Sequence, residues 1–328
     1  MHDFKKLRQN EVHTRYWLKK RGWTEEQIDN WFFIEKNYVD TLTAITELNT
    51  RRKKGENVKD DLKELKENFF MTHGEDNRLM LPNMLSESVP SGLNEESNVT
   101  IHRRRIENME PTGLPHHNIN ELGISEATAI STSAMVCLMD DMALLRRAMG
   151  NYFLDEARTK GFVEIAPPYL VNEGSMIGTG QYPKFKDDAY QTTDGLSLIP
   201  TGEVPLTNLF AHITYPNGKF SGTRKVCGLT PCYRKEAGAS GKRDKGLIRN
   251  HQFDKVELVM IVDDFMIYPH INQILDLVEK ILKDLNLDYR KIMLCGGDTG
   301  FSAMLTFDYE VFLYGSDRWL EVSSPYRS

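Results

Sequence analysis

The sequence lacks the cysteine pairs of a metal site or a disulfide framework. Its 4 cysteines contain no CxxC motif and stand at separated positions, Cys137, Cys227, Cys232 and Cys295. We interpret them as buried structural thiols of a protein from a reducing compartment. The N-terminus has no apolar core of the signal-peptide type, and no run of about 18 apolar residues occurs. These absences predict a cytoplasmic protein without a membrane span.

Positive charge is not in excess either. The chain carries 41 lysines and arginines against 47 acidic residues, a formal net charge of -6. This balance argues against a generic nucleic-acid binder, although a local cationic surface can still serve a polyanionic partner. With 328 residues, 40% of them hydrophobic, the chain is large enough for one big globular domain or two.

Residues 1–72 are predicted to form a helical hairpin. Thr24 and Gln27 make a capping box at the start of the first helix. A heptad stripe follows it, consisting of Trp31, Ile34, Tyr38, Thr41, Ile45 and Leu48. After the turn "RRKKGEN", the segment "VKDDLKELKENFF" carries a shorter stripe. At the rise of an α-helix, the two helices would be about 39 Å and about 21 Å long. Part of the heptad stripe on the first helix would therefore have no partner on the second. The alternative is a pair of surface helices on a core.

The remaining chain predicts a connector and then an α+β domain. Residues 73–123 are rich in Pro, Gly, Asn and Glu without periodicity, as is typical of a connector. Helical periodicity returns in "DDMALLRRAMGNYFLDEARTKGF" and in "DDFMIYPHINQILDLVEKILKDL", the latter capped by Asp263 or Asp264. The strand-like segments are "VEIAPPYLV", "SLIPT", "TRKVCGLTPCYRKE", "KVELVMIV", "RKIMLC", "TFDYEVFLY" and "RWLEVSS". Because turns link most of them, an antiparallel sheet flanked by helices is favoured over a doubly wound one.

Four short segments place polar residues on these predicted strands. Thr201 and Glu203 share a face in "IPTGEVPLTNLF", with Gly202 permitting close backbone approach, and Arg234 and Glu236 share a face in "CYRKE". The other two segments contribute Arg249, His251, Phe253 and Glu257, and then Glu321, Ser323 and Ser324. A single glutamate on a strand is usually a solvated edge residue. Together, however, carboxylates and hydroxyls suit an ammonium and an alcohol, and Arg234 with the basic loop after it suits phosphates.

Two further motifs have competing interpretations. "GDTGFSA" is glycine-rich, but it lacks a Walker lysine and a dinucleotide pattern, so a tight turn is favoured over a phosphate loop. His251 is interpreted as a structural or phosphate-facing histidine rather than a general base or a metal ligand.

Five ordered segments resemble the bacterial-type seryl-tRNA synthetases, a family of class II aminoacyl-tRNA synthetases. They are "KGFVEIAPPYL", "GTGQYPKF", "LIPTGEVPLTNLF", "PCYRKEAGASGKRDKGLIRNHQFDKVEL" and "LCGGDTGFSAMLTFDYEVFLYGSDRWLEVSS". The first matches the first class II signature and ends at Pro168, which the resemblance assigns to a homodimer interface. The N-terminal hairpin is similar to the family's tRNA-binding coiled-coil arm, in shortened form. The resemblance therefore implies a class II catalytic core over residues 124–328.

The resemblance also implies the roles of individual residues. Arg234 would be the catalytic arginine that bridges the serine carboxylate and the ATP α-phosphate. Glu236 would read the adenine amino group, with Phe253 as its stacking platform. The serine site would comprise Thr201, Gly202, Glu203, Arg234 and Glu257. The ATP site would comprise Arg234, Lys235, Glu236, Arg249, Phe253, Glu321, Val322, Ser323 and Ser324, and Glu321 and Ser324 would face Mg²⁺ through ATP.

The implied activity is that of a serine--tRNA ligase, which activates L-serine with ATP and transfers it to tRNA(Ser). The chain ends at "EVSSPYRS", whereas the family continues into a third class II signature that bears an arginine for the ATP γ-phosphate. We therefore expect a truncated or partial core with open sheet edges. One alternative is a non-catalytic synthetase-like protein that binds serine, nucleotide or RNA. Another is a tRNA-independent ligase that loads a carrier protein, but the zinc ligands of that group have no counterpart here.

Overall fold

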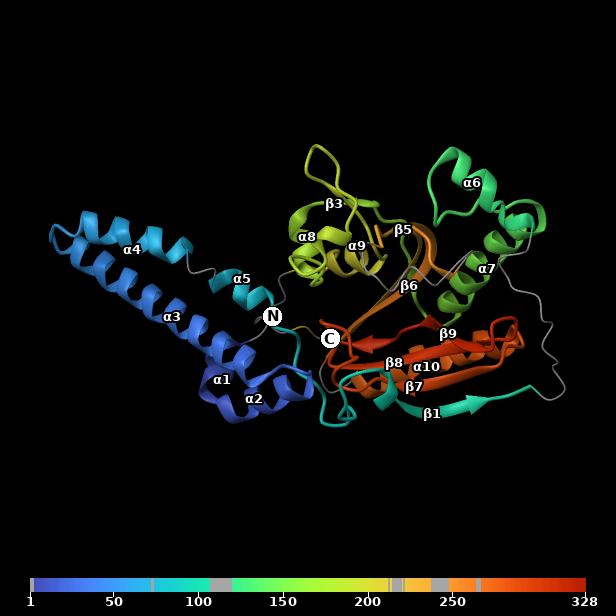
Figure 1. Cartoon of the computed structure of the whole chain (residues 1–328), viewed down its shortest axis with the longest axis horizontal. Helices are drawn as coiled ribbons and strands as arrows, with labels where there is room; N and C mark the ends of the chain where they lie inside the picture. Colours follow the sequence, from blue (N-terminus) through green and yellow to red (C-terminus); the bar gives the residue numbers. More distant parts are fainter. Residues whose placement is uncertain are drawn as a thin grey trace. The chain divides into compact units, whose positions relative to one another are not determined.

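The computed structural model describes residues 3–71, 74–106, 120–211, 213, 220, 222–236, 248–263 and 267–328. The chain forms two units (Figure 1). Unit 1 comprises Met1–Val99, Met293–Thr306 and Tyr326–Ser328, and unit 2 comprises Thr100–Ile292 and Phe307–Pro325. Within the described ranges, no helix is both long and apolar enough to cross a membrane.

Unit 1 is mainly helical. Its helices are α1 (Phe4–Gln9), α2 (Glu11–Lys20), α3 (Glu25–Lys53), α4 (Lys59–Met71) and α5 (Gly74–Leu79). The predicted helix start is confirmed, because Thr24 and Gln27 make both hydrogen bonds of the capping box. The helix α4 runs back along α3 and is the shorter of the two (Figure 1). The stripe on α3 thus meets α4 along only part of its length.

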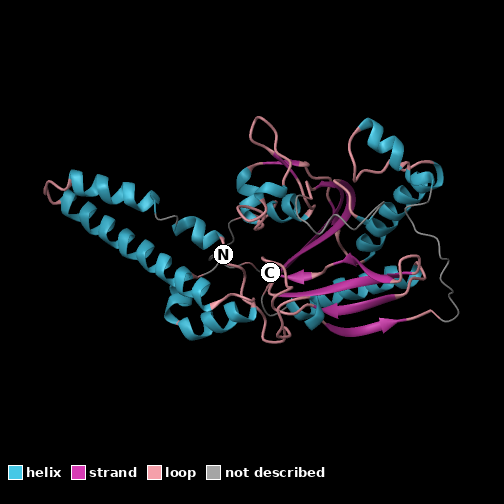
Figure 2. Ribbon diagram, in the orientation of Figure 1, coloured by secondary structure: helices cyan, strands magenta, loops and turns pink. Residues whose placement is uncertain are grey.

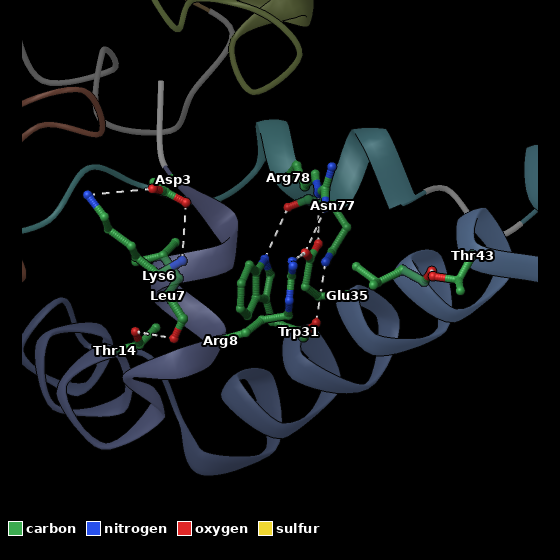
Figure 3. Close-up of polar contacts among 11 residues, drawn as sticks. Asp3, Lys6, Leu7, Arg8, Thr14, Trp31, Glu35, Thr43, Asn77 and Arg78 are labelled. Atoms are coloured by element: carbon green, nitrogen blue, oxygen red, sulfur yellow. Dashed lines mark hydrogen bonds and ion pairs between the residues drawn. The ribbon is translucent and has the colours of Figure 1, made fainter. Parts of the chain in front are cut away.

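The first part of α3 packs against elements that the sequence analysis did not predict. α1 and α2 share a buried cluster with α3 that consists of Leu7, Trp17, Leu18, Ile28, Trp31 and Leu81. Beside it, Glu35 of α3 is fully buried (Figure 3). Arg78 of α5 donates from Nε and Nη2 to the two Glu35 oxygens, both at 2.8 Å, and Arg8 of α1 donates to the same carboxylate. This ionic cluster joins three helices of unit 1.

The glycine-rich loop after residue 294 is held by close packing. Gly296–Asp298 form a turn, as predicted. A Cβ on Gly296 would lie 2.0 Å from the Lys20 carbonyl oxygen, and one on Gly297 would lie 2.4 Å from that of Leu93. Arg21 donates to the carbonyl oxygens of Asn83, Thr299, Gly300 and Ala303, and burial lowers its pKa to about 10. The two adjacent glycines are therefore explained by the approach of neighbouring backbone.

Unit 2 contains a three-stranded sheet in the order β2-β5-β6. The long strands β5 (Thr223–Tyr233) and β6 (Gln252–Val262) pair antiparallel along their whole lengths, and the short β2 (Val163–Glu164) runs parallel to β5. The predicted strand "VEIAPPYLV" is split into β2 and β3 (Leu170–Val171), because two adjacent prolines between them cannot donate ladder hydrogen bonds. β3 pairs instead with β4 (Ser197–Leu198).

A second sheet has the order β1-β7-β8, with β9 on the other side of β8 (Figure 2). Its strands are β1 (Val99–Arg104), β7 (Tyr289–Met293), β8 (Leu305–Leu313) and β9 (Arg318–Ser323). The two-residue strand β10 (Tyr326–Arg327) pairs with Leu305 and Thr306, the part of β8 that belongs to unit 1. The expected fold class, an antiparallel sheet flanked by helices, is confirmed. Within the described chain, β6 pairs with β5 and β9 pairs with β8.

Two long helices cover these sheets. α7 (Asp140–Thr159) and α10 (Ile267–Asp284) both match predicted helices, whereas the expected cap at Asp264 lies outside the described residues. One face of α10 packs with α7 over β5 and β6, in a cluster that includes Leu154, Cys227 and Leu277. The other face of α10 packs on Tyr289 of β7 and Tyr309 of β8. The shorter helices are α6 (Ile124–Ile130), α8 (Glu173–Gly178) and α9 (Glu203–Asn208), with 3-10 turns at Glu95–Ser97, Asn120–Leu122 and Lys186–Asp188.

Segment 73–123 is not free of regular structure. It contains α5 and β1, whose six residues are mostly exposed. Exposure of both strand faces removes the apolar alternation by which a strand is recognised, so sequence periodicity could not predict β1.

Candidate active site

Thr201 and Gly202 lie in the turn between β4 and α9, and Glu203 is the first residue of α9, so the expectation that Thr201 and Glu203 share a strand face is wrong. The Tyr233 backbone N–H donates to the Ile199 carbonyl oxygen at 2.9 Å, which fixes this turn against the end of β5. A Cβ on Gly202 would lie 2.9 Å from Thr230 Oγ1 and 3.1 Å from Glu257 Cβ. Glycine at 202 therefore allows the close approach that the sequence analysis expected.

Thr201 and Glu257 are hydrogen-bonded, and Lys255 joins them. Thr201 Oγ1 donates to Glu257 Oε2 at 2.7 Å, while Lys255 Nζ lies 3.1 Å from Thr201 Oγ1 and 2.9 Å from Glu257 Oε2. Burial alone would lower the pKa of Lys255, but the neighbouring carboxylate of Glu257 more than offsets this, and the pKa is raised. Lys255 was missed by the sequence analysis, although it stands two residues before Glu257 and therefore on the same face of β6.

Arg234 and Phe253 also come together. The Arg234 guanidinium carbon lies 5.0 Å from the centre of the Phe253 ring, and Nε donates to the Pro200 carbonyl oxygen at 3.3 Å. Its terminal nitrogens make no ion pair within the described ranges, and the side chain is exposed. An exposed, stacked arginine of this kind is suited to an anionic ligand. The Arg234 backbone N–H donates to the His251 carbonyl oxygen, and His251 Nδ1 lies 3.0 Å from the Arg234 carbonyl oxygen. Both contacts fit a structural role for His251.

The expectation that Arg234 and Glu236 share a strand face is wrong. β5 ends at Tyr233, and Glu236 has a φ of 51°, so strand alternation does not extend to these residues. The Lys235 N–H instead donates to the Asp188 carbonyl oxygen at 2.9 Å, which turns the chain away from β6. Arg249 also precedes its strand, since β6 begins at Gln252, and it pairs with Glu236. The basic loop, residues 237–247, lies outside the described residues.

Residues 321–324 belong to the other sheet. Glu321, Val322 and Ser323 close β9, where Glu321 stands opposite Glu310 of β8, and Glu321 and Val322 are exposed. Ser324 follows the strand and donates to Asp308 Oδ1 at 2.5 Å. These residues are thus not part of the hydrogen-bonded group of Thr201, Lys255 and Glu257. In the part of the chain that the structure describes, no group of three or more His, Cys, Asp or Glu side chains could hold a metal ion.

Comparison with known proteins identifies the fold. Residues 184–325 match the family described as tRNA synthetase class II core domain (G, H, P, S and T). A crystal structure of seryl-tRNA synthetase from Pyrococcus horikoshii complexed with ATP superposes with a TM-score of 0.80 at 27% identity, covering 99% of this chain and 83% of that one. The antiparallel sheet and these matches define a class II aminoacyl-tRNA synthetase core.

The sequence relatives specify which class II enzymes these are. A serine--tRNA ligase from Trichormus variabilis is 39% identical over 291 residues, which are 85% of this chain and 67% of the relative. One from Sinorhizobium fredii is 35% identical over 358 residues, covering 99% of this chain and 82% of the relative. The chain belongs to the serine--tRNA ligase family. Among such relatives it spans between 58% and 82% of their own length.

Proposed function

We propose that the chain catalyses the serine--tRNA ligase reaction, with L-serine, ATP and tRNA(Ser) as substrates. The observation that carries this is that, in a chain of this family, the hydrogen-bonded carboxylate of Glu257 lies on the same face of β6 as Phe253, four residues before it, over which Arg234 stacks. The α3–α4 hairpin would contact the tRNA. The cytoplasm, where aminoacyl-tRNA is used, would be the site of the reaction.

The reaction needs no nucleophile from the protein. A carboxylate oxygen of serine attacks the α-phosphorus of ATP, the bond to the β-phosphate breaks, and pyrophosphate leaves. A ribose hydroxyl at the end of the tRNA then attacks the acyl carbon of seryl-adenylate, and AMP leaves. The protein contributes by placing the reactants and by compensating charge at the α-phosphate. Arg234, a cation without a carboxylate partner in the described chain, is the group suited to this role.

The charges of the pocket fit the parts of the two small substrates. Glu203 would face the serine ammonium, Glu257 would accept from the serine hydroxyl, and Thr201 would hold the Glu257 carboxylate in place. Phe253 offers a stacking face for adenine beside Glu236, whose present partner is Arg249. A site that hydrogen-bonds the serine hydroxyl would favour serine over alanine by up to about 10⁴-fold in kcat/KM, because alanine leaves the acceptor unpaired.

Magnesium would be held mainly through the ATP phosphates. Mg²⁺ prefers oxygen ligands and is commonly bound by one or two protein groups plus substrate phosphates. The Glu321 carboxylate is exposed, and Ser324, three residues further along the chain, supplies a hydroxyl, so oxygen donors of the right kind are present. We assign these two residues, with Val322 and Ser323 between them, to the nucleotide side of the site, together with Lys235 and Arg249.

Serine-dependent exchange of labelled pyrophosphate into ATP tests the proposed function. We expect exchange with L-serine, at least about 10²-fold weaker exchange with L-alanine or glycine at equal concentration, and acid-precipitable serine when tRNA(Ser) is added. Binding of serine and ATP by calorimetry without any exchange would contradict the ligase assignment. That outcome would favour the non-catalytic synthetase-like alternative.

We also propose that the chain forms a homodimer through the face around Pro168. Near it, Leu144, Val163, Tyr169 and Leu170 are exposed apolar residues. A cavity of about 570 Å³ lies beside them, lined in part by Leu144, Arg146 and Tyr169. Leu144 and Tyr169 line the same cavity, so exposed apolar side chains meet there, as is typical of an interaction surface. Analytical sedimentation of the wild-type chain should give a dimer, and Tyr169→Asp should shift it toward monomer. The control Tyr268→Asp, at a tyrosine of α10 that is 59% exposed, should leave the chain dimeric. A monomeric wild type would contradict the proposal.

A further inference from the structure

The hydroxyl of Thr201 has its hydrogen-bonding capacity used within the protein. A hydroxyl donates one hydrogen bond and accepts two. Thr201 Oγ1 accepts from Lys255 Nζ at 3.1 Å and from the Glu203 backbone N–H at 3.3 Å, and both of these groups can only donate. The hydroxyl hydrogen must therefore point to Glu257 Oε2, 2.7 Å away. This leaves Thr201 with nothing to offer a ligand while Lys255 is in place.

The same lysine fixes the carboxylate of Glu257. Lys255 Nζ lies 2.9 Å from Glu257 Oε2, so this oxygen accepts from both the ammonium and Thr201. The second oxygen, Oε1, has no hydrogen-bond partner in the described ranges. Lys255 and Thr201 together thus hold the carboxylate in one orientation, with one oxygen left for a ligand.

Charge in the pocket is also balanced by Lys255. Glu203 and Glu257 supply two carboxylates, Arg234 and Lys255 supply two cations, and Lys255 interacts electrostatically with each of the other three. A balanced set of charges suits a zwitterion, because such a ligand brings no net charge into the pocket. Without Lys255, the carboxylates would outnumber the cations.

We propose that Lys255 is a positioning and specificity residue of the pocket, which orients Thr201 and Glu257 so that Glu257 Oε1 accepts the hydroxyl of L-serine. The inference rests on the proposed function. It makes the contribution of Thr201 indirect, because this hydroxyl acts by orienting Glu257. Alanine offers no donor to Oε1, so losing the orientation should reduce discrimination against alanine as well as affinity for serine.

Lys255→Met removes the ammonium and keeps a chain of similar length. In pyrophosphate exchange we expect the KM for serine to rise about tenfold or more and the ratio of kcat/KM for serine over alanine to fall by a similar factor. The KM for ATP should change less than about twofold, since Lys255 faces Thr201 and Glu257. Lys255→Arg, which keeps donors and charge, should recover part of the loss.

The matched control is Lys280→Met. Lys280 pairs with Glu156 at 3.2 Å, and the exposed fractions of this pair, 43% and 18%, match the 41% and 17% of Lys255 and Glu257. It lies on α10, so its loss should leave both KM values unchanged. Circular dichroism of each variant reports folding, and Lys255→Gln takes the place of Lys255→Met if that variant does not fold.

A double-mutant cycle shows whether Lys255 acts through Glu257. Lys255→Met added to Glu257→Gln should cause little further loss, because the carboxylate it orients is already gone. A lower serine KM in Lys255→Met would overturn the inference, since it would mean that the lysine competes with the serine ammonium. Unchanged serine KM and selectivity would also overturn it while the ligase function stands. A wild-type chain that neither exchanges pyrophosphate nor binds serine would overturn both.

Discussion

Replacing Arg234 with alanine is expected to lower serine-dependent pyrophosphate exchange by about 10²- to 10³-fold. The reason is that negative charge develops on the α-phosphate as the serine carboxylate attacks it, and the guanidinium is placed to compensate it. The side chain is exposed, stacked on Phe253 at 5.0 Å, and has no ion-pair partner in the described part of the chain. Structural damage should be small, because among the described residues the side chain donates a single hydrogen bond, to the Pro200 carbonyl oxygen at 3.3 Å.

Arg224→Ala is the matched control for this experiment. Arg224 lies on β5, the strand that Arg234 directly follows; it is also exposed, stacks over Phe220 at 5.8 Å and donates to a backbone carbonyl oxygen. It lies at the opposite end of β5 from Arg234, so exchange should remain within about twofold of wild type. If Arg234→Ala keeps exchange within about tenfold of wild type, Arg234 does not compensate the transition-state charge.

The strands and long helices could be predicted because their burial follows a simple period. β5, β6 and β8 coincide closely with predicted segments, and α10 has one continuous apolar stripe. α1 and α2 were missed for the opposite reason. They are 6 and 10 residues long, with one and three buried residues, and they are stabilised by packing on α3 rather than by a periodic pattern of their own.

The candidate site was predictable in its residues but not in its geometry. The polar residues on β6 and in the β4–α9 turn could be selected because they interrupt apolar segments. β5 ends at Tyr233, and the backbone beyond it bonds through Lys235 N–H to the Asp188 carbonyl oxygen, a partner distant in sequence that no local pattern indicates. Lys255 was passed over because a lysine on a strand is usually solvated, and only the structure shows its bonds to Thr201 and Glu257.

Glu35 was not predicted to be buried, because a charged residue is usually solvated. It directly follows Ile34 of the predicted stripe, at a position where a heptad pattern expects a charged and exposed side chain, yet it is buried between Trp31 and Tyr38. The carboxylate is tolerated there because Arg8 and Arg78 surround it, and Arg78 also stacks on the rings of Phe4 and Tyr38, at 4.6 and 4.2 Å. A buried ion is stabilised only when its charge and its hydrogen bonds are both satisfied.

Arg78→Met is therefore expected to destabilise unit 1 by about 3 kcal/mol, the lower end for breaking a buried ion pair, because Arg8 still faces Glu35. Methionine keeps an apolar contact with the two rings, so the loss reports mainly on the charge. Of the 4 tryptophans, three (Trp17, Trp23 and Trp31) lie in unit 1, and urea unfolding followed by tryptophan fluorescence should show the midpoint falling by about 1 to 2 M. Arg51→Met, on α3 like Glu35, is the control: its partner Glu56 is 47% exposed, so its loss should cost under about 1 kcal/mol. Equal midpoints for the two variants would show that Glu35 does not need Arg78 to remain buried.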